Sequence, residues 1–305
     1  MLNCGSSTFA DAEDYEAALP FDADLLLLQP GHFLSRLTWI NLPRLGLLRG
    51  QESLSRVARV SLPLHRIFVI FPMDRASPLI CDGVSVPWGD IMLRGPGERF
   101  WQRTAAASVW GAISLTRSCL VSYGRTLIGR SFSPPSYGQV LRLAAGDRED
   151  LLRLHSHAAR LAETGPERLA RPEIVRALEH DVIAALVTAI ADADPRQGVT
   201  DGCHCCGLLV RLADVIATSP HHVPSIPQFC RATGVSERML RTCCLNLLGI
   251  SPARYISLRQ RKHLRHAWQP TQEPAGKVEA TGACRSHRGA TATGRPPVWR
   301  PCMRA

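Results

Sequence analysis

Residues 225–255, SIPQFCRATGVSERMLRTCCLNLLGISPARY, decide how the C-terminal part of this chain folds. Ser225 and Gln228 have the spacing of a capping box, in which the serine hydroxyl accepts from a backbone N–H and the glutamine reaches back to the cap. Pro227 suits the first turn of a helix, where its missing N–H is not needed. Gly234 predicts the end of this helix, because glycine adopts positive φ at little cost. The pattern therefore predicts a short helix with a defined start and stop.

A second helix is predicted directly after the tight turn. Ser236 is a suitable N-cap, and Glu237 favours the positive end of the helix dipole. Val235 and Leu240 are expected to fill the wedge between the two helices, and the small Cys230 lets them approach. Two helices joined in this way form a helix-turn-helix, whose second helix commonly enters the major groove of DNA. The side of this helix expected to face outward carries Arg238, Arg241 and Thr242.

A third, basic helix is expected to follow. Gly249 predicts the end of the second helix, and Ser251-Pro252 supplies a cap and a first-turn proline. The helix is expected to run to Trp268. Its basic residues are Arg254, Arg259, Arg261, Lys262 and Arg265.

The segment GVSERMLRTCCLNLLGISPARYISLR resembles the first helix-turn-helix of the AraC family of bacterial transcription regulators. The matching residues are Gly234-Val235-Ser236, Leu240, Leu248-Gly249, Ser251-Pro252 and Tyr255. The resemblance implies that the helix after Ser236 reads base edges and that the next helix holds phosphates. The DNA-contacting residues it implies are Ser236, Arg238, Arg241, Thr242, Arg254 and Arg259. The alternative is a generic three-helix packing unit with arginines on its solvent face.

The family normally carries a second helix-turn-helix, and residues 269–305 do not resemble one. They contain no Leu, Ile or Phe and are rich in Pro, Gly, Thr, Ala and Arg, so we expect this tail to be disordered. The chain uses 34 Arg and 2 Lys, a bias expected of a GC-rich gene, and such a gene read out of frame would yield a similar tail. A frameshift near Gln269 and a natural disordered extension are both consistent with this composition.

The net charge of +10 is concentrated at the C-terminal end. Residues 1–220 hold 22 Arg against 23 acidic residues, a net charge of −1. Residues 221–268 hold 8 basic residues against Glu237, a net charge of +7, and the tail adds +4. This distribution is expected of a protein with a nearly neutral module that does not bind DNA and a basic C-terminal module that does.

The 11 cysteines do not predict a secreted disulfide framework, because their number is odd and the sequence shows no signal-peptide pattern. Cys230, Cys243 and Cys244 fall on apolar helix positions, where a free thiol behaves as a small hydrophobe. The run Cys203–Cys206 (CHCC) has the wrong spacing for a tetrahedral metal site. We therefore expect a cytoplasmic protein with no metal and no cofactor. No apolar run of 18 residues predicts a membrane span.

The N-terminal part predicts an α+β fold with a cupin-like antiparallel β domain. Residues 1–20 are polar and are expected to form a loose arm, and residues 21–145 an effector or dimerisation domain. Its expected strands are short apolar runs, several of which alternate apolar and polar residues: 25–29, 35–42, 44–50, 56–62, 66–71, 90–95 and 109–115. Gly89-Asp90 and Gly95-Pro96-Gly97-Glu98 resemble a cupin strand and turn. The cupin metal histidines are missing, since His32 and His65 stand alone.

Helices are predicted after the β domain. Residues 146–193 contain one apolar stripe through Leu151 and Ala158 and a second, after Pro172, through Val182 and Leu186. These helices are expected to pack either on the β domain or on a second copy of the chain. Residues 194–206 are then predicted to be a linker, and residues 207–268 a truncated AraC-like domain.

Catalysis finds no support in the sequence, which lacks a nucleophile elbow, a phosphate-binding glycine loop and a zinc-protease motif. The prediction is a non-enzymatic transcription regulator that binds double-stranded DNA, impaired by the missing second helix-turn-helix. A small-molecule effector and a homodimer are the other expected partners, and no membrane is expected. The alternative is a remnant that does not bind DNA and acts only through dimerisation, or is inactive.

Overall fold

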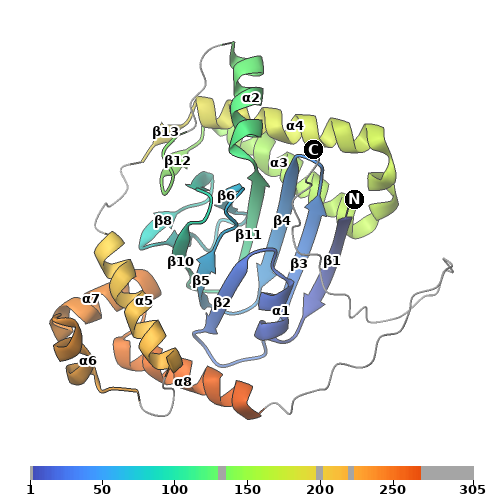
Figure 1. The fold of residues 1–305 in the computed structure, drawn as a ribbon. Helices are drawn as coiled ribbons and strands as arrows, with labels where there is room; N and C mark the ends of the chain where they lie inside the picture. Colours follow the sequence, from blue (N-terminus) through green and yellow to red (C-terminus); the bar gives the residue numbers. More distant parts are fainter. Residues whose placement is uncertain (1–2, 130–134, 197–201, 219–222, 269–305) are drawn as a thin grey trace, which may run out of the picture.

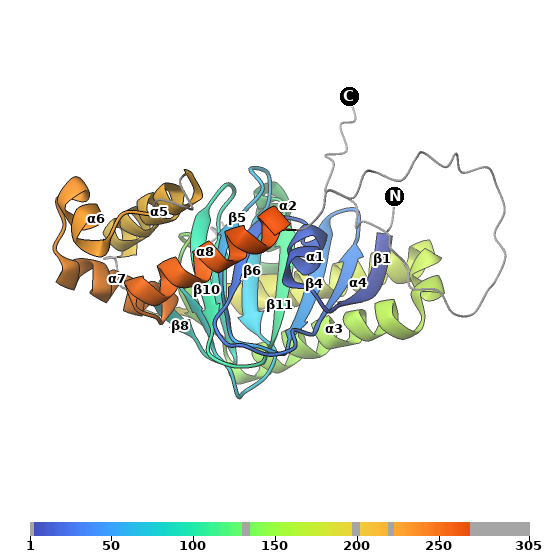
Figure 2. The same ribbon diagram turned by 90° about the horizontal axis from the view of Figure 1, so that it is seen from below.

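The computed structural model describes residues 3–129, 135–196, 202–218 and 223–268. Two antiparallel β-sheets lie face to face, and helices cover the outer face of each (Figures 1 and 2). Three apolar clusters fill the three spaces between these four layers. The predicted α+β class and the N-terminal antiparallel β domain are therefore confirmed.

The larger sheet contains eight strands in the order β1-β3-β4-β11-β6-β9-β12-β13, and the smaller contains five in the order β2-β5-β10-β7-β8. The strands of the first are β1 (Asn3–Phe9), β3 (Ser35–Asn41), β4 (Leu45–Glu52), β11 (Ser108–Leu115), β6 (Ile67–Pro72), β9 (Asp90–Arg94), β12 (Val140–Arg142) and β13 (Asp194–Pro195). Those of the second are β2 (Asp22–Leu27), β5 (Arg56–Ser61), β10 (Arg99–Thr104), β7 (Leu79–Cys81) and β8 (Val84–Val86).

Alternation along the strands decides which cluster each side chain enters, because successive side chains point to opposite faces. In β6, Ile67 and Phe71 pack towards the covering helices, whereas Phe68 and Ile70 point between the sheets. Both faces of this strand are buried, which explains its continuous apolar sequence.

Helices α2 (Arg117–Ile128), α3 (Ala145–Thr164) and α4 (Pro172–Ala191) cover the outer face of the larger sheet, with a short 3₁₀ helix, η1 (Pro166–Ala170), between the last two. Leu151 and Ala158 of α3 and Val182 and Leu186 of α4 are buried in this layer. The two apolar stripes predicted from the sequence are confirmed. They pack against the β domain of the same chain.

The smaller sheet is covered by the C-terminal helices α5 (Gly202–Thr218), α6 (Ile226–Thr233), α7 (Glu237–Leu248) and α8 (Pro252–Trp268), which we call the reader. Leu26, Val57 and Trp101 turn outward from the sheet into one cluster with buried residues of the reader. Figure 2 shows α8 lying along the β domain as far as α1 (Ala12–Ala18). The reader is therefore packed onto the β domain.

The prediction of a loose arm over residues 1–20 is wrong. Strand β1 pairs with β3 along its whole length. Asp11 caps α1 by accepting from the backbone N–H groups of Glu13 and Asp14, and Tyr15 of this helix is fully buried. Glu13 and Asp14 lie in the first turn of α1, where their charges suit the helix dipole.

The predicted linker at 194–206 is also wrong at both ends. Asp194 and Pro195 form β13 on the edge of the larger sheet, and α5 begins at Gly202, inside the predicted linker. Strands β1, β7, β8, β10 and β12 and helix α2 were not predicted. The predicted disordered tail, 269–305, lies outside the described residues. No helix in the described part of the chain has the length and hydrophobicity needed to cross a membrane.

Candidate nucleic-acid interface

Helix α6 begins and ends where the sequence predicts. The backbone N–H of Gln228 donates to Ser225 Oγ at 3.4 Å, and the backbone N–H of Ser225 donates to Gln228 Oε1 at 2.8 Å, so the capping box is formed. Gly234 closes the helix with φ of +71°. This left-handed geometry requires glycine or a short polar residue.

Helix α7, the expected recognition helix, is held in place by caps and by its inner face. Ser236 Oγ accepts from the backbone N–H of Met239 at 3.1 Å, and Gly249 closes the helix with φ of +72°. The predicted start and end are confirmed. The buried residues of the inner face are Leu240, Cys243, Cys244, Leu247 and Leu248.

The outward face of α7 presents the side chains predicted to read bases. Arg238, Arg241 and Thr242 are exposed and share one face because they lie three and four positions apart. Thr242 Oγ1 donates to the carbonyl of Arg238 at 3.0 Å. Two neighbouring arginines on a capped helix can pair bidentately with guanine O6 and N7. Their contact with DNA stays a prediction.

Three of the basic residues of α8, Arg254, Arg259 and Lys262, contact the β domain, which the sequence did not predict. Arg254 donates to the carbonyl of Leu28 at 2.6 Å. Arg259 forms an ion pair with Asp24 of β2 and is 5% exposed. In this arrangement Arg259 is not accessible to a DNA phosphate, and Arg254, although exposed, is held by a backbone carbonyl.

Lys262 makes the most extensive of these contacts. Its Nζ donates to Glu16 Oε1 at 2.6 Å, to Asp24 Oδ1 at 2.9 Å and to the carbonyl of Leu25 at 2.8 Å. The residue is 8% exposed, so its ammonium is almost removed from water. Each of its three N–H bonds therefore has an acceptor in the β domain.

The two carboxylates respond differently to this contact. Burial raises the pKa of Glu16 above its ordinary value, although Lys262 opposes the shift. Burial favours a higher pKa for Asp24 as well, but the positive charges of Arg259 and Lys262 outweigh burial and hold this pKa below its ordinary value. Asp24 is the carboxylate that both cations share, and its charge is the better stabilised of the two.

Apolar contacts reinforce the polar ones. The rings of Trp101, from β10, and Tyr255, from α8, meet edge to face with centroids 6.2 Å apart. Tyr255 Oη in turn accepts from Arg259 Nε at 3.0 Å. The tyrosine matched to the AraC pattern thus lies at the junction of the reader and the smaller sheet.

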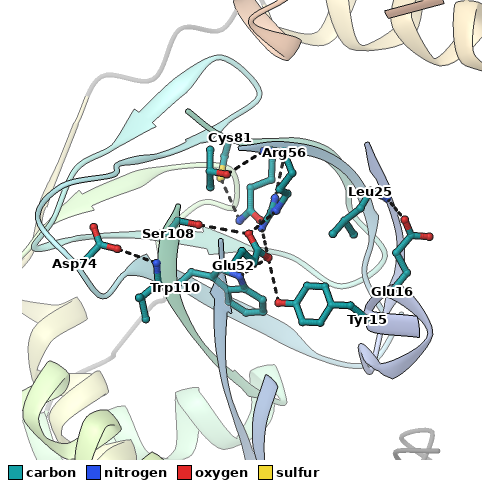
Figure 3. Close-up of polar contacts among 12 residues, drawn as sticks. Tyr15, Glu16, Leu25, Glu52, Arg56, Asp74, Cys81, Ser108 and Trp110 are labelled. Atoms are coloured by element: carbon teal, nitrogen blue, oxygen red, sulfur yellow. Dashed lines mark hydrogen bonds and ion pairs between the residues drawn. The ribbon is translucent and has the colours of Figure 1, made fainter. Parts of the chain in front are cut away.

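A second charged cluster lies inside the β domain and centres on Glu52 (Figure 3). Arg56 Nε donates to Glu52 Oε2 at 2.9 Å, and both side chains are almost fully buried. Tyr15 Oη and Trp110 Nε1 donate to Glu52 Oε1 at 3.1 and 2.9 Å. Burial, and then the neighbouring Glu52 carboxylate, raise the pKa of Tyr15, so its hydroxyl stays a donor. Arg56 Nη2 also donates to Gln102 Oε1 at 2.8 Å.

Two recesses open near these charged clusters. One, of about 500 Å³, lies at the ends of β3, β4 and β11 and is lined by Glu52, Asp74 and Ser108. Ser35 lines it as well, and its buried Oγ has no hydrogen-bond partner among the described residues. The other, of about 450 Å³, lies between α1, β2 and α8 and includes Lys262 in its lining.

The cysteines differ from the prediction. Cys243 is not a free thiol, because it forms a disulfide with Cys205 of α5, whereas Cys230 and Cys244 are buried thiols as predicted. No sequence pattern predicts this pair, since its two members lie on separate helices 38 residues apart. The described residues contain no group of three His, Cys, Asp or Glu side chains arranged to hold a metal ion.

Comparison with known proteins gives no sequence-level assignment. No family model and no curated protein matches this chain. Among solved structures, the AraC-like transcriptional activator CuxR is similar over 87% of this chain and 95% of its own, with 16% identity and a TM-score of 0.46. ToxT from Vibrio cholerae is similar over 87% of this chain and 83% of its own, with 7% identity and a TM-score of 0.28.

An RmlC-like cupin from Shewanella frigidimarina matches 31% of this chain and 86% of its own, with 11% identity and a TM-score of 0.22. The structural neighbours thus include AraC-type regulators over most of the chain and a cupin over part of it. Because every one of these TM-scores is below 0.5, they carry no argument about what this chain binds.

Proposed function

We propose that this chain is a sequence-specific, DNA-binding transcription regulator of AraC type whose helix α7 enters the major groove. The observation that carries the proposal is the outward face of α7. Arg238 and Arg241 stand there exposed on a helix whose caps and buried inner face fix its position. Arginine at such a position favours guanine. Ser236, which caps the helix, and Thr242 complete the proposed reading face.

Docking of α8 limits how much of the reader can meet DNA. While Arg259 is paired with Asp24 and Arg254 with the carbonyl of Leu28, binding depends on α7. Movement of the reader away from β2 would free both arginines for phosphates, which fix register rather than sequence. The docked arrangement is therefore the weaker DNA-binding state in this proposal.

The β domain is proposed to bind a small-molecule effector. The recess beside Glu52 offers carboxylates, hydroxyls and the unpartnered Ser35 Oγ, so it suits a polar ligand that donates hydrogen bonds. A homodimer would double the number of readers and raise the avidity for paired sites. A single reader is expected to bind with a small ratio of specific to non-specific affinity.

A non-DNA-binding remnant is the second candidate. It is favoured by the ion pairs of Arg259 and Lys262 with carboxylates of the β domain. These pairs stabilise the fold, so the two basic residues are accounted for without DNA binding. Such a protein would act through dimerisation or not at all.

The effects of single arginine substitutions on binding to duplex DNA separate the two candidates. The regulator should bind with an affinity that Arg238→Ala and Arg241→Ala each lower by about 1–3 kcal/mol at one preferred sequence. Arg211→Ala, which removes an exposed arginine from α5, is the charge-matched control and should change little. Equal weakening by all three variants on every duplex would show attraction to phosphate alone and would refute base reading.

A further inference from the structure

The disulfide between Cys205 and Cys243 joins the first helix of the reader to its recognition helix. Cys205 lies near the start of α5, and Cys243 lies on the inner face of α7. Their Cα atoms are 5.1 Å apart, within the range that a disulfide spans without moving the backbone. The bond closes a loop that contains the rest of α5, all of α6 and the first half of α7.

The surroundings of the pair favour oxidation at Cys205 and distinguish the pair from Cys206 and Cys244. Cys205 is partly exposed, so a small oxidant can reach it, whereas Cys243 is fully buried and faces it. Cys206 points elsewhere, since its thiol donates to Asp82 of the β7–β8 turn at 3.4 Å. Burial raises the pKa of Cys244 to about 12, which keeps that thiol protonated and unreactive.

We propose that Cys205 and Cys243 form a reversible thiol–disulfide switch that responds to a two-electron oxidant of the peroxide class. The Cys205 thiolate attacks hydrogen peroxide, an S–O bond forms as the O–O bond breaks, and hydroxide leaves and takes up a proton to give water. Cys243 sulfur then attacks the sulfenic sulfur of Cys205, and the S–O bond breaks with loss of a second water. Two thiols and one peroxide thus give one disulfide and two waters, and a dithiol reductant later returns the disulfide to two thiols while it is itself oxidised to a disulfide.

The reader is small enough for this bond to control its folded population. It spans residues 202–268, and a unit of this size seldom buries enough apolar surface by itself to be stable by a wide margin, so it depends on its packing against the β domain and on this bond. In a reducing compartment, which the sequence predicts for this chain, disulfides are usually transient and redox-sensing. Oxidation therefore raises the fraction of chains whose reader is folded, because the disulfide lowers the conformational entropy of the unfolded reader.

The bond leaves the proposed DNA-facing side of α7 unobstructed. Cys243 faces inward, whereas Arg238 and Arg241 are exposed. The oxidised form is therefore the tighter DNA binder, because apparent affinity scales with the fraction of competent protein. This last consequence rests on the proposed function, whereas the switch itself does not.

The test uses the full chain, oxidised with hydrogen peroxide or reduced with dithiothreitol, as wild type, Cys205→Ser and the matched control Cys206→Ser. Oxidised wild type and Cys206→Ser should yield a linked pair of peptides containing Cys205 and Cys243. Amide exchange in α6 should be about 100-fold slower in the oxidised than in the reduced form. Cys205→Ser should lose both the link and the exchange difference.

Three results would overturn the switch: both thiols remaining open to alkylation after oxidation, an exchange difference that persists in Cys205→Ser, or equal exchange in the two wild-type forms. Duplex-DNA binding is measured on the same samples. Absence of binding in both forms would count against the proposed function, while the peptide link and the exchange rates would still decide the switch.

Discussion

Lys262→Met tests whether the reader is held against the β domain by the buried ammonium. Methionine keeps the apolar stem of the side chain and removes three donated hydrogen bonds, to Glu16, Asp24 and the carbonyl of Leu25. Removing one partner of a buried ion pair costs about 3–5 kcal/mol. Asp24 is 42% exposed on its side chain and keeps Arg259, so the lower end of this range, about 3 kcal/mol, is expected.

The assay is amide exchange in α8 and β2, together with urea unfolding of the full chain. A loss of about 3 kcal/mol corresponds to about a 100-fold rise in exchange through opening of this contact. Arg261→Met is the matched control, because it removes the same charge from an exposed position one residue earlier on the helix. Unchanged protection in α8 and β2, or an equal effect of both variants, would refute the docking argument.

Three further predictions concern the turn of the reader and the interior of the β domain. Gly234→Val should destabilise the reader by about 1–3 kcal/mol, because a β-branched residue resists the φ of +71°. A clash is not the cause, since an added Cβ meets no atom within 4 Å. Gly234→Asn should be tolerated, and equal melting profiles of the two variants would contradict this. Burial lowers the pKa of His155 to about 4, so the stability it supports is complete above about pH 6.5 and is lost as the pH falls towards 4. His155→Gln should therefore flatten the pH dependence of unfolding in that window by up to about 1.4 kcal/mol per pH unit, and an unchanged slope would show that the imidazole is not buried neutral. Glu52→Gln should lower the free energy of unfolding by about 3–5 kcal/mol, because it leaves Arg56 uncompensated, and urea titration showing less than about 1 kcal/mol would contradict the buried pair.

The reader could be predicted from the sequence because its signals are local. Ser225, Gln228 and Gly234 act through neighbours in the chain, and the structure forms each cap they predict. The strands with period-two alternation were found for the same reason. Strand β1 was missed because its pairing with β3 depends on residues far along the chain, from Phe9 with Ser35 to Asn3 with Asn41.

The contacts that govern the site are not local, and the sequence could not supply them. Arg259 and Asp24 are 235 residues apart, and no pattern links a basic helix to one acid on β2. The same holds for Cys205 and Cys243, which only the packing of α5 on α7 brings together. From the sequence, Arg259 is therefore predicted to contact DNA, whereas in the fold this residue forms an ion pair with Asp24 of the β domain.

Selection from a random duplex-DNA library with the full chain, at physiological salt, tests the central claim most directly. Wild type should enrich sites that share a guanine-containing sequence, and Arg241→Ala should relax the preference at one base position. Enrichment should be weak unless the chain forms a homodimer, because each reader contacts one segment of the major groove. If the library stays unenriched, or if a variant lacking both Arg238 and Arg241 enriches the same sites as wild type, α7 does not read DNA.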